Sequence, residues 1–278
     1  MPKITRRSKP AKRRGKSPVK TQGKNKGKNR GPARSARKVS KKSSKKSSKQ
    51  TVAKPQRAHG GVAKKQKPWT PAEIHEAFSR FRNANPEPKG ELEHLNPFTL
   101  LVAVVLSAQA TDAGVNRATR ALFQVADTPQ KMVALGEEKL RDYIKTIGLY
   151  RNKAKNVIAL SEKLISEFGG EVPRTRAEIE SLPGAGRKTA NVVLNMAFGE
   201  QTLAVDTHVF RVANRTGLAP GKTPLEVELG LERVVPPEFM LHAHHWLILH
   251  GRYTCLARKP RCEVCLINDL CRWDEKTV

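Results

Sequence analysis

Apolar residues recur at helical spacing along the chain from Trp69 onward. The segment Thr70-Pro71-Ala72-Glu73 has the form of a capping box, with proline at the first helical position. Apolar side chains then follow three or four positions apart, at Ile74, Ala77, Phe78 and Phe81. This pattern predicts an amphipathic helix with one buried face.

A second helix is predicted after Asn96-Pro97. Residues 98–108 are apolar almost all round, which predicts a buried central helix. A buried strand is the alternative, but the proline start and the lack of alternation favour the helix. Further helical segments are predicted at 112–124, 137–145, 151–168, 176–182, 187–198, 207–216, 224–234 and 238–250.

The helix at 176–182 begins with a second capping box, Thr175 to Glu178, and it must end at Leu182-Pro183 because proline interrupts a helix. Strand signals are sparse, and no repeat has the period of a solenoid. The predicted fold class is therefore all-α.

Charge divides the chain into two parts. Residues 1–67 contain 26 Lys or Arg, no Asp or Glu, and no Leu, Phe, Tyr, Trp or Cys, so we expect this tail to be disordered. The remaining residues carry 27 basic and 25 acidic side chains and are numerous enough for a hydrophobic core. We find no run of about 18 apolar residues and no apolar signal-peptide core, which argues against a membrane span.

The basic tail predicts a nucleic-acid partner. A flexible polycation releases counterions when it neutralises phosphates, so it adds affinity without sequence preference. The alternatives are a solvated tail that improves solubility and an import signal. A mitochondrial presequence is disfavoured, because the tail is rich in Lys and has no apolar helix face.

The segment Leu182–Ala190 predicts a tight hairpin between two helices. Gly184 and Gly186 allow a sharp turn and close approach of a ligand, and the free N–H groups of the next helix then face outward. This arrangement binds phosphate without reading a base. An ordinary helix–helix turn is the alternative.

Lys188 follows this hairpin in the first turn of a predicted helix, where the helix dipole disfavours the ammonium form and favours a nucleophilic amine. Asp206, 18 residues later, begins another helix. It is a candidate for proton transfer beside a Schiff base, but Asp at this position is also a common N-cap. The spacing alone leaves both roles open.

Four cysteines lie close together near the C-terminus, in the pattern Cys255-x6-Cys262-x2-Cys265-x5-Cys271. Four thiolates suit an iron–sulfur cluster or tetrahedral zinc, and the single Cys-x2-Cys knuckle leans toward iron–sulfur; disulfides are a third option. The residues between the first two cysteines predict a basic loop that contacts phosphates through Arg258, Lys259 and Arg261. We assign no metal to the histidines at 242, 244, 245 and 250, which are expected to pack or to form hydrogen bonds.

The hairpin lysine, Val205-Asp206-Thr207-His208 and the cysteine pattern together resemble the endonuclease III family, bifunctional DNA glycosylases with a helix-hairpin-helix motif and a [4Fe–4S] cluster. The likeness extends from about Thr70 to the C-terminus and includes residues 106–112, 144–150 and 244–255. It implies iron–sulfur rather than zinc, with Cys255, Cys262, Cys265 and Cys271 as ligands.

The resemblance also implies a two-lobed protein and a function in base-excision repair. Residues 90–201 would form a six-helix barrel lobe with the hairpin, residues 69–89 and 202–278 the iron–sulfur lobe, and residues 1–68 the tail. Lys188 would attack C1′ of a damaged pyrimidine nucleotide in double-stranded DNA, with Asp206 as the catalytic carboxylate. The Schiff base then permits β-elimination, which cuts the strand 3′ to the abasic site.

DNA contacts follow from the same resemblance. Gln109 matches the residue that fills the gap left by the flipped nucleotide, and Ile147 and Leu149 match a loop that wedges the opposite strand, where inserted side chains partly replace lost stacking. The implied DNA-binding residues are Gln109, Ile147, Leu149, Gly184, Gly186, Arg187, Arg258, Lys259 and Arg261. The protein is expected to be a monomer that does not bind membranes.

The tail departs from the compact bacterial forms of this family. It leaves the chemistry unchanged, and we expect a cytoplasmic, nucleoid-associated bacterial protein, with a nuclear protein as the alternative. Two other functions remain open: a monofunctional adenine glycosylase, which typically lacks a lysine at the hairpin position, and a DNA-binding protein without catalysis. Lys188 argues against the first, and the presence of both Lys188 and Asp206 argues against the second.

Deletion of residues 1–67 should flatten the dependence of DNA affinity on salt. The slope of log K against log salt is negative, and each lost phosphate contact should make it less negative by about 0.9. Titrations of undamaged duplex at several salt concentrations, with the full chain and the truncated chain, measure this slope. An unchanged slope would show that the tail does not contact DNA.

Overall fold

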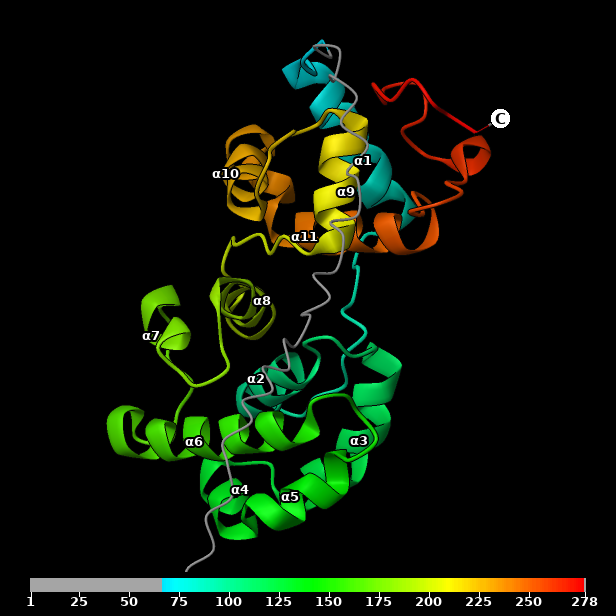
Figure 1. Cartoon of the computed structure of the whole chain (residues 1–278). Coiled ribbons are helices and arrows are strands. Elements are labelled where there is room, and N and C mark those ends of the chain that lie inside the picture. The colour runs from blue at the N-terminus through cyan, green and yellow to red at the C-terminus, as the bar shows by residue number, and fades with distance from the viewer. Residues whose placement is uncertain (1–66, 278) are drawn as a thin grey trace, which may run out of the picture. The chain divides into compact units, whose positions relative to one another are not determined.

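The computed structural model describes residues 67–277, and within this range it contains α-helices, one short 3-10 helix and no strand. The all-α prediction is confirmed for these residues. The basic tail up to residue 66, for which the sequence predicts disorder, and Val278 lie outside the described residues. The elements shown in Figure 1 are α1 Pro71–Ala84, α2 Pro97–Leu106, α3 Asp112–Val125, α4 Pro129–Leu135, α5 Glu137–Ile144, α6 Tyr150–Phe168, α7 Arg176–Glu180, α8 Arg187–Phe198, α9 Thr207–Thr216, α10 Pro224–Val234, α11 Pro237–Tyr253 and η1 Cys262–Val264.

The predicted helices agree with the structure to within about three residues at their ends, and the apolar segment after Asn96 is a helix rather than a strand. Helix α4 was not predicted, because its seven residues are too few to display a hydrophobic period. Helix α7 ends at Glu180, earlier than the proline requires, because Ser181 already forms the C-cap.

Side-chain caps fix where the first helices begin. In α1 the backbone N–H of Glu73 donates to the Thr70 hydroxyl, and the backbone N–H of Thr70 donates to the Glu73 carboxylate, which completes the predicted capping box. Asn96 and Thr99 form the same reciprocal pair at α2. At α7 the Thr175 hydroxyl accepts from the N–H of Glu178, at 3.4 Å.

Helices α2–α8 enclose one hydrophobic core, and we call this part the central lobe. All residues of α2 from Phe98 to Leu106 are buried, and α2 packs against α3, α6 and α8. The surrounding helices supply fully buried side chains that include Leu122, Met132, Leu140, Leu160 and Val193. Because α2 is surrounded on all sides, its sequence carries almost no polar residue.

Helix α1, helices α9–α11 and the C-terminal segment enclose a second core, and we call this part the terminal lobe. Aromatic rings dominate it: the ring centroids of Phe78 and Phe239 lie 5.8 Å apart, and Trp246 packs on both. The indole N–H of Trp69 donates to the carbonyl of Thr216, at 3.0 Å, which ties the start of the described chain to α9.

The two lobes are joined by residues 85–96 and residues 199–205, which we call the first and second crossing. Figure 1 shows the helices of each lobe gathered together, and both lobes belong to the same compact unit. Among the described helices, none from one lobe packs closely along a helix of the other. None of them is long and apolar enough to cross a membrane. The lobes therefore meet mainly through individual side chains.

Candidate active site and cysteine cluster

The turn between α7 and α8 requires glycine at one of its two predicted positions. Gly184 has φ of +81°, and a Cβ added there would lie 2.9 Å from the Asn156 side chain and 3.2 Å from Val105. Gly186 differs, since a Cβ there would meet nothing within 4 Å. It is the N-cap of α8 and has no side chain to cap the first turn. The N–H groups of that turn are therefore open to an anionic group such as a phosphate.

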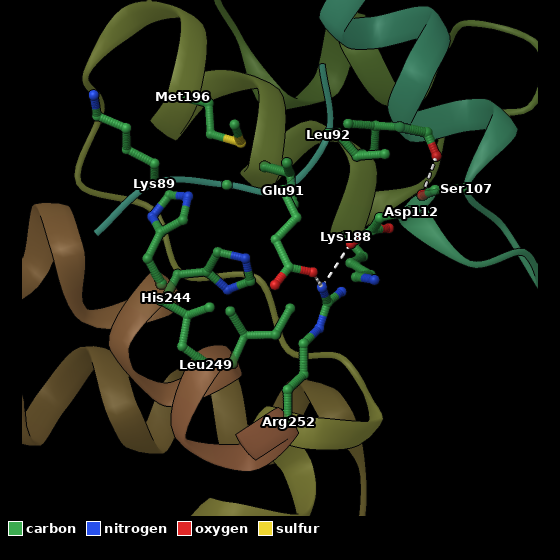
Figure 2. Close-up of a pocket in the computed structure, with 15 residues that line it drawn as sticks. Lys89, Glu91, Leu92, Ser107, Asp112, Lys188, Met196, His244, Leu249 and Arg252 are labelled. Atoms are coloured by element: carbon green, nitrogen blue, oxygen red, sulfur yellow. Dashed lines mark hydrogen bonds and ion pairs between the residues drawn. The ribbon is translucent and has the colours of Figure 1, made fainter. Parts of the chain in front are cut away.

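Lys188 is the second residue of α8 and is exposed. It lines two adjacent pockets at the boundary between the lobes, which also share Ser107, Asp112 and Arg252. One of them, the Asp206 pocket, is lined in addition by Gln109, Asp206 and His208. The other, the His244 pocket, is drawn in Figure 2, where Lys188 lies near Asp112 and Arg252. Lys188 from the central lobe and Asp206 from the terminal lobe thus face one space.

Asp206 is the N-cap of α9. Its Oδ1 accepts hydrogen bonds from the backbone N–H groups of His208 and Val209, both at 2.8 Å. Both bonds use the same oxygen, so Oδ2 takes no part in the cap. The capping role that the sequence suggested is present, and the same carboxylate also lines the pocket that contains Lys188.

The loops that carry Gln109 and Leu149 lie side by side, since a Cβ on Gly148 would be 3.9 Å from the carbonyl oxygen of Gln109. Gln109, with φ of +54°, and Leu149, with φ of +58°, are the two non-glycine residues with positive φ in the described part of the chain. Both side chains are exposed, and that of Leu149 is 57% accessible. Two adjacent loops thus hold an amide and an apolar side chain outward in a disfavoured backbone conformation.

Ile147 and Arg187 are placed differently from the other predicted DNA contacts. Ile147 is 5% exposed and belongs to the core of the central lobe, so it anchors the loop that presents Leu149. Arg187 uses Nε and Nη2 to bind the nearly buried Glu228 of α10, at 2.9 and 2.8 Å. Its guanidinium joins the two lobes rather than pointing freely to solvent.

The four cysteines line one pocket at the end of the terminal lobe, and all four are free thiols. Burial raises the pKa of the Cys265 thiol to about 11 and also raises that of Cys271. Thiolates here therefore need a nearby positive charge, which an iron–sulfur cluster supplies. In residues 67–277 no group of three or more His, Cys, Asp or Glu side chains has the geometry of a single-ion site. All four thiols line this one pocket, which agrees with the four-thiolate ligand set of an iron–sulfur cluster.

Two arginines of α9 brace the loop between Cys255 and Cys262. Arg215 donates to the carbonyls of Leu256 and Ala257, at 2.7 and 3.0 Å, and Arg211 donates to the carbonyl of Cys255. The predicted phosphate contacts on this loop, Arg258, Lys259 and Arg261, are all exposed. Sequence reasoning missed the two bracing arginines, because their partners are backbone atoms about 40 residues away.

Buried histidines surround the site without forming a cluster of ligands. His244 lines the pocket beside Lys188, and its Nδ1 is 2.8 Å from the carbonyl oxygen of Ala204. Burial lowers the pKa of His244 to about 3 and that of His245 to about 4. Both rings are therefore neutral at pH 7, and neither adds charge near Lys188.

Sequence reasoning also missed an ion network on the His244 pocket. Arg252 of α11 binds Asp112 of α3, with Nη1 2.7 Å from Oδ2, and it also binds Glu91 of the first crossing. The motifs around Asp112 and Arg252 were noted only as parts of a resemblance. Nothing local in the sequence indicates that residues 140 positions apart form a pair.

Comparison with known proteins gives consistent results. Residues 102–237 match the HhH-GPD superfamily of base excision DNA repair proteins, and residues 255–271 match the iron–sulfur binding domain of endonuclease III. The chain is 61% identical over 198 residues to endonuclease III of Treponema pallidum, covering 71% of this chain and 94% of that protein. It is 59% identical over 201 residues to endonuclease III of Escherichia coli K12, covering 72% and 95%.

A solved structure of an endonuclease III is also similar to this chain. The fold matches that of a trapped endonuclease III–DNA covalent intermediate with a TM-score of 0.69 and 47% identity, over 73% of this chain and 96% of that one. The chain therefore spans nearly the whole length of these proteins.

Replacement of Leu149 by glycine should leave the free energy of unfolding unchanged or raise it by up to about 1 kcal/mol, because left-handed backbone costs a leucine about 1–2 kcal/mol and costs glycine little. Leu229→Gly is the matched control: its side chain is similarly exposed, at 45%, but it lies inside α10, where glycine should cost about 1 kcal/mol. Urea unfolding of both variants measures the difference. Equal losses would show that Leu149 is not strained.

Proposed function

This chain belongs to the endonuclease III family of base-excision DNA repair proteins, and on that basis we propose that Lys188 is its catalytic nucleophile and Asp206 its catalytic carboxylate. The family is that of DNA glycosylases with AP lyase activity. The observation that carries the assignment is that both side chains line one pocket although they come from different lobes. Because Lys188 is exposed on the first turn of α8, its amine is accessible to a nucleotide.

The chemistry proceeds by covalent catalysis. The amine of Lys188 attacks C1′ of the flipped nucleotide, the glycosidic bond breaks, and the base leaves with the bonding electrons and gains a proton. Loss of the amine protons and opening of the sugar ring give a Schiff base between C1′ and the lysine nitrogen. Removal of a C2′ proton then expels the 3′ phosphate by β-elimination. Both hydrogen bonds of the cap go to Oδ1 of Asp206, so Oδ2 takes no part in the cap. In this proposal Oδ2 stabilises positive charge or accepts a proton.

DNA is held on both sides of this pocket. Gln109 lines the Asp206 pocket, so it is placed to occupy the gap left by the flipped nucleotide, and Leu149 projects from the adjacent loop toward the opposite strand. Ile147 acts from the core, where it supports the Leu149 loop. The α8 N-terminus at Gly186 binds phosphate through backbone N–H groups.

The cysteine cluster holds a [4Fe–4S] group, for which Cys255, Cys262, Cys265 and Cys271 are the ligands. When bound, the group would supply the positive charge that the buried thiolates need, and its ligands Cys255 and Cys262 would hold the two ends of the basic loop. The exposed side chains Arg258, Lys259 and Arg261 of that loop then contact DNA phosphates with little loss of entropy.

The substrates we propose are oxidised or ring-damaged pyrimidines and abasic sites in double-stranded DNA, acted on by a monomer. The neutral ring of His244 and the apolar side chains of Val192 and Met196 line the pocket next to Lys188 and suit an uncharged base. The relatives reported above are bacterial, and with the basic tail they favour a protein associated with the nucleoid.

Lys188→Ala should abolish the covalent adduct that borohydride traps on a duplex with one thymine glycol, because no amine remains to form the Schiff base. Its rate of base release should fall by about 10³-fold or more. Lys131→Ala is the control, since Lys131 is an exposed lysine of the same lobe that is paired with Asp127 and lines neither pocket. A full yield of adduct from Lys188→Ala would refute the assignment, and no adduct from the unaltered chain would favour a monofunctional or purely binding protein.

Cys262→Ser should remove the visible absorbance of the iron–sulfur group and weaken DNA binding, because the basic loop loses its anchor. Lys259→Gln provides the contrast: it should weaken binding while absorbance per protein stays the same. Absorbance spectra and duplex titrations of both variants test this. A Cys262→Ser protein with undiminished absorbance would show that this thiol is not a ligand.

A further inference from the structure

One guanidinium connects three separate parts of the chain beside the active site. Arg252, in the last turn of α11, binds Asp112 at the start of α3, with Nη1 2.7 Å from Oδ2, and binds Glu91 of the first crossing through the same nitrogen. The hydroxyl of Tyr253 donates to the other carboxylate oxygen of Glu91. Figure 2 shows Arg252 extending from α11 toward Glu91 and toward Asp112, which lies next to Lys188.

Arg252 and Asp112 are partly shielded from solvent, whereas Glu91 is exposed. The exposed fraction of the side chain is 23% for Arg252 and 16% for Asp112. Burial opposes the charge of Arg252, but the hydrogen bond to Asp112 and the charges of both carboxylates outweigh it and raise its pKa above the ordinary value. Partly buried pairs of this kind are screened by salt much less than surface pairs are. Salt therefore weakens the bond between Arg252 and Asp112 less than it weakens a surface ion pair.

The network lies between the two lobes, next to the pockets that contain Lys188. In the described part of the chain, α3 and α11 do not pack closely against each other, so Arg252 links two helices that come from different lobes. Lys188 belongs to one of the joined lobes and Asp206 to the other. Arg252 lines both pockets that Lys188 lines, so a change in its bonds acts where the two reactive groups face each other.

We propose that Arg252 is a positioning residue for the chemical step: by holding Asp112 and Glu91 together, it fixes the distance between the two lobes and with it the alignment of Lys188 and Asp206. The proposal rests on the roles assigned above to Lys188 and Asp206. Arg187, which joins α8 to Glu228 of α10, fixes the lobes at a second place, so the two pairs together restrict rotation as well as separation.

Arginine suits this role better than lysine does. A guanidinium offers several N–H donors in a rigid plane and can bind two carboxylates in fixed directions, whereas an ammonium is a point charge on a flexible stem. Arg252→Lys should therefore retain the charge and recover only part of the alignment.

The test measures chemistry separately from binding, with the full chain and its iron–sulfur group. With protein in excess over a thymine glycol duplex, the single-turnover rate of borohydride-trappable adduct should fall by about 100-fold in Arg252→Gln, the scale expected for a misplacement of about 1 Å. The dissociation constant for an uncleavable abasic-site duplex should change little. Arg252→Lys should give an intermediate rate.

Arg120→Gln is the matched control. Arg120 also joins α3 to the first crossing, through Glu93, but this pair is exposed and lines neither pocket that contains Lys188. Its trapping rate should equal that of the unaltered chain. A second check is the pair Arg252→Gln and Glu91→Gln, whose combined loss should be smaller than the product of the single losses, because both remove the same interaction.

Normal trapping by Arg252→Gln, or an equal loss in Arg120→Gln, would overturn the proposal, and so would a loss confined to the dissociation constant. Failure of the underlying function is distinguishable, because in that case the unaltered chain itself would form no adduct. If Arg252→Gln does not fold, Glu91→Gln alone decides: it should reduce the trapping rate without changing affinity, and a normal rate would refute the role of the network.

Discussion

The alignment of Lys188 with Asp206 depends on ion pairs that cross a boundary without helix packing. Each lobe has its own hydrophobic core, and the helices of the two cores do not pack along each other in the described structure. Hydrophobic burial therefore stabilises two separate cores, which come together at the second crossing, where Ala204 belongs to one core and Leu203 and Val205 belong to the other. The relative position of the lobes is set by the two crossings and by directional contacts, among them Arg187 with Glu228 and Arg252 with Asp112. Directional contacts suit this purpose because they fix distances that nonspecific burial leaves variable.

Local backbone strain marks the two loops that we propose to contact DNA. Gln109 and Leu149 keep positive φ values although neither is glycine, and their loops touch at Gly148. Such strain persists only where the surroundings hold the chain firmly, and here α2 and the buried Ile147 supply that support. The stability of the central lobe thus offsets the cost of holding these two exposed side chains in a disfavoured backbone conformation.

Much of this architecture could be predicted from sequence because its causes are local. Caps at Thr70 and Asn96, the apolar body of α2 and the glycine hairpin each depend on residues within a few positions of one another. In the candidate site, the sequence motifs singled out Lys188, Asp206 and the four cysteines. The structure brings Lys188 and Asp206 to one pocket and the cysteines to another. The burial of Ile147, the engagement of Arg187 by Glu228 and the Arg252 network could not be predicted, since each depends on a neighbour brought close only by folding. A single sequence records which residues are present but not which distant pairs meet.

Hydrogen bonds from α8 hold the second crossing at the boundary between the two lobes. Asn195 of α8 donates through its side-chain amide to the carbonyls of Glu200 and Leu241, and Asn191 donates to that of Leu203, so α8 itself fastens the crossing. A transient separation of the lobes breaks these polar links and leaves both cores intact. Because each lobe has its own core, we expect amide hydrogens near the boundary to exchange with solvent through openings that cost less than global unfolding.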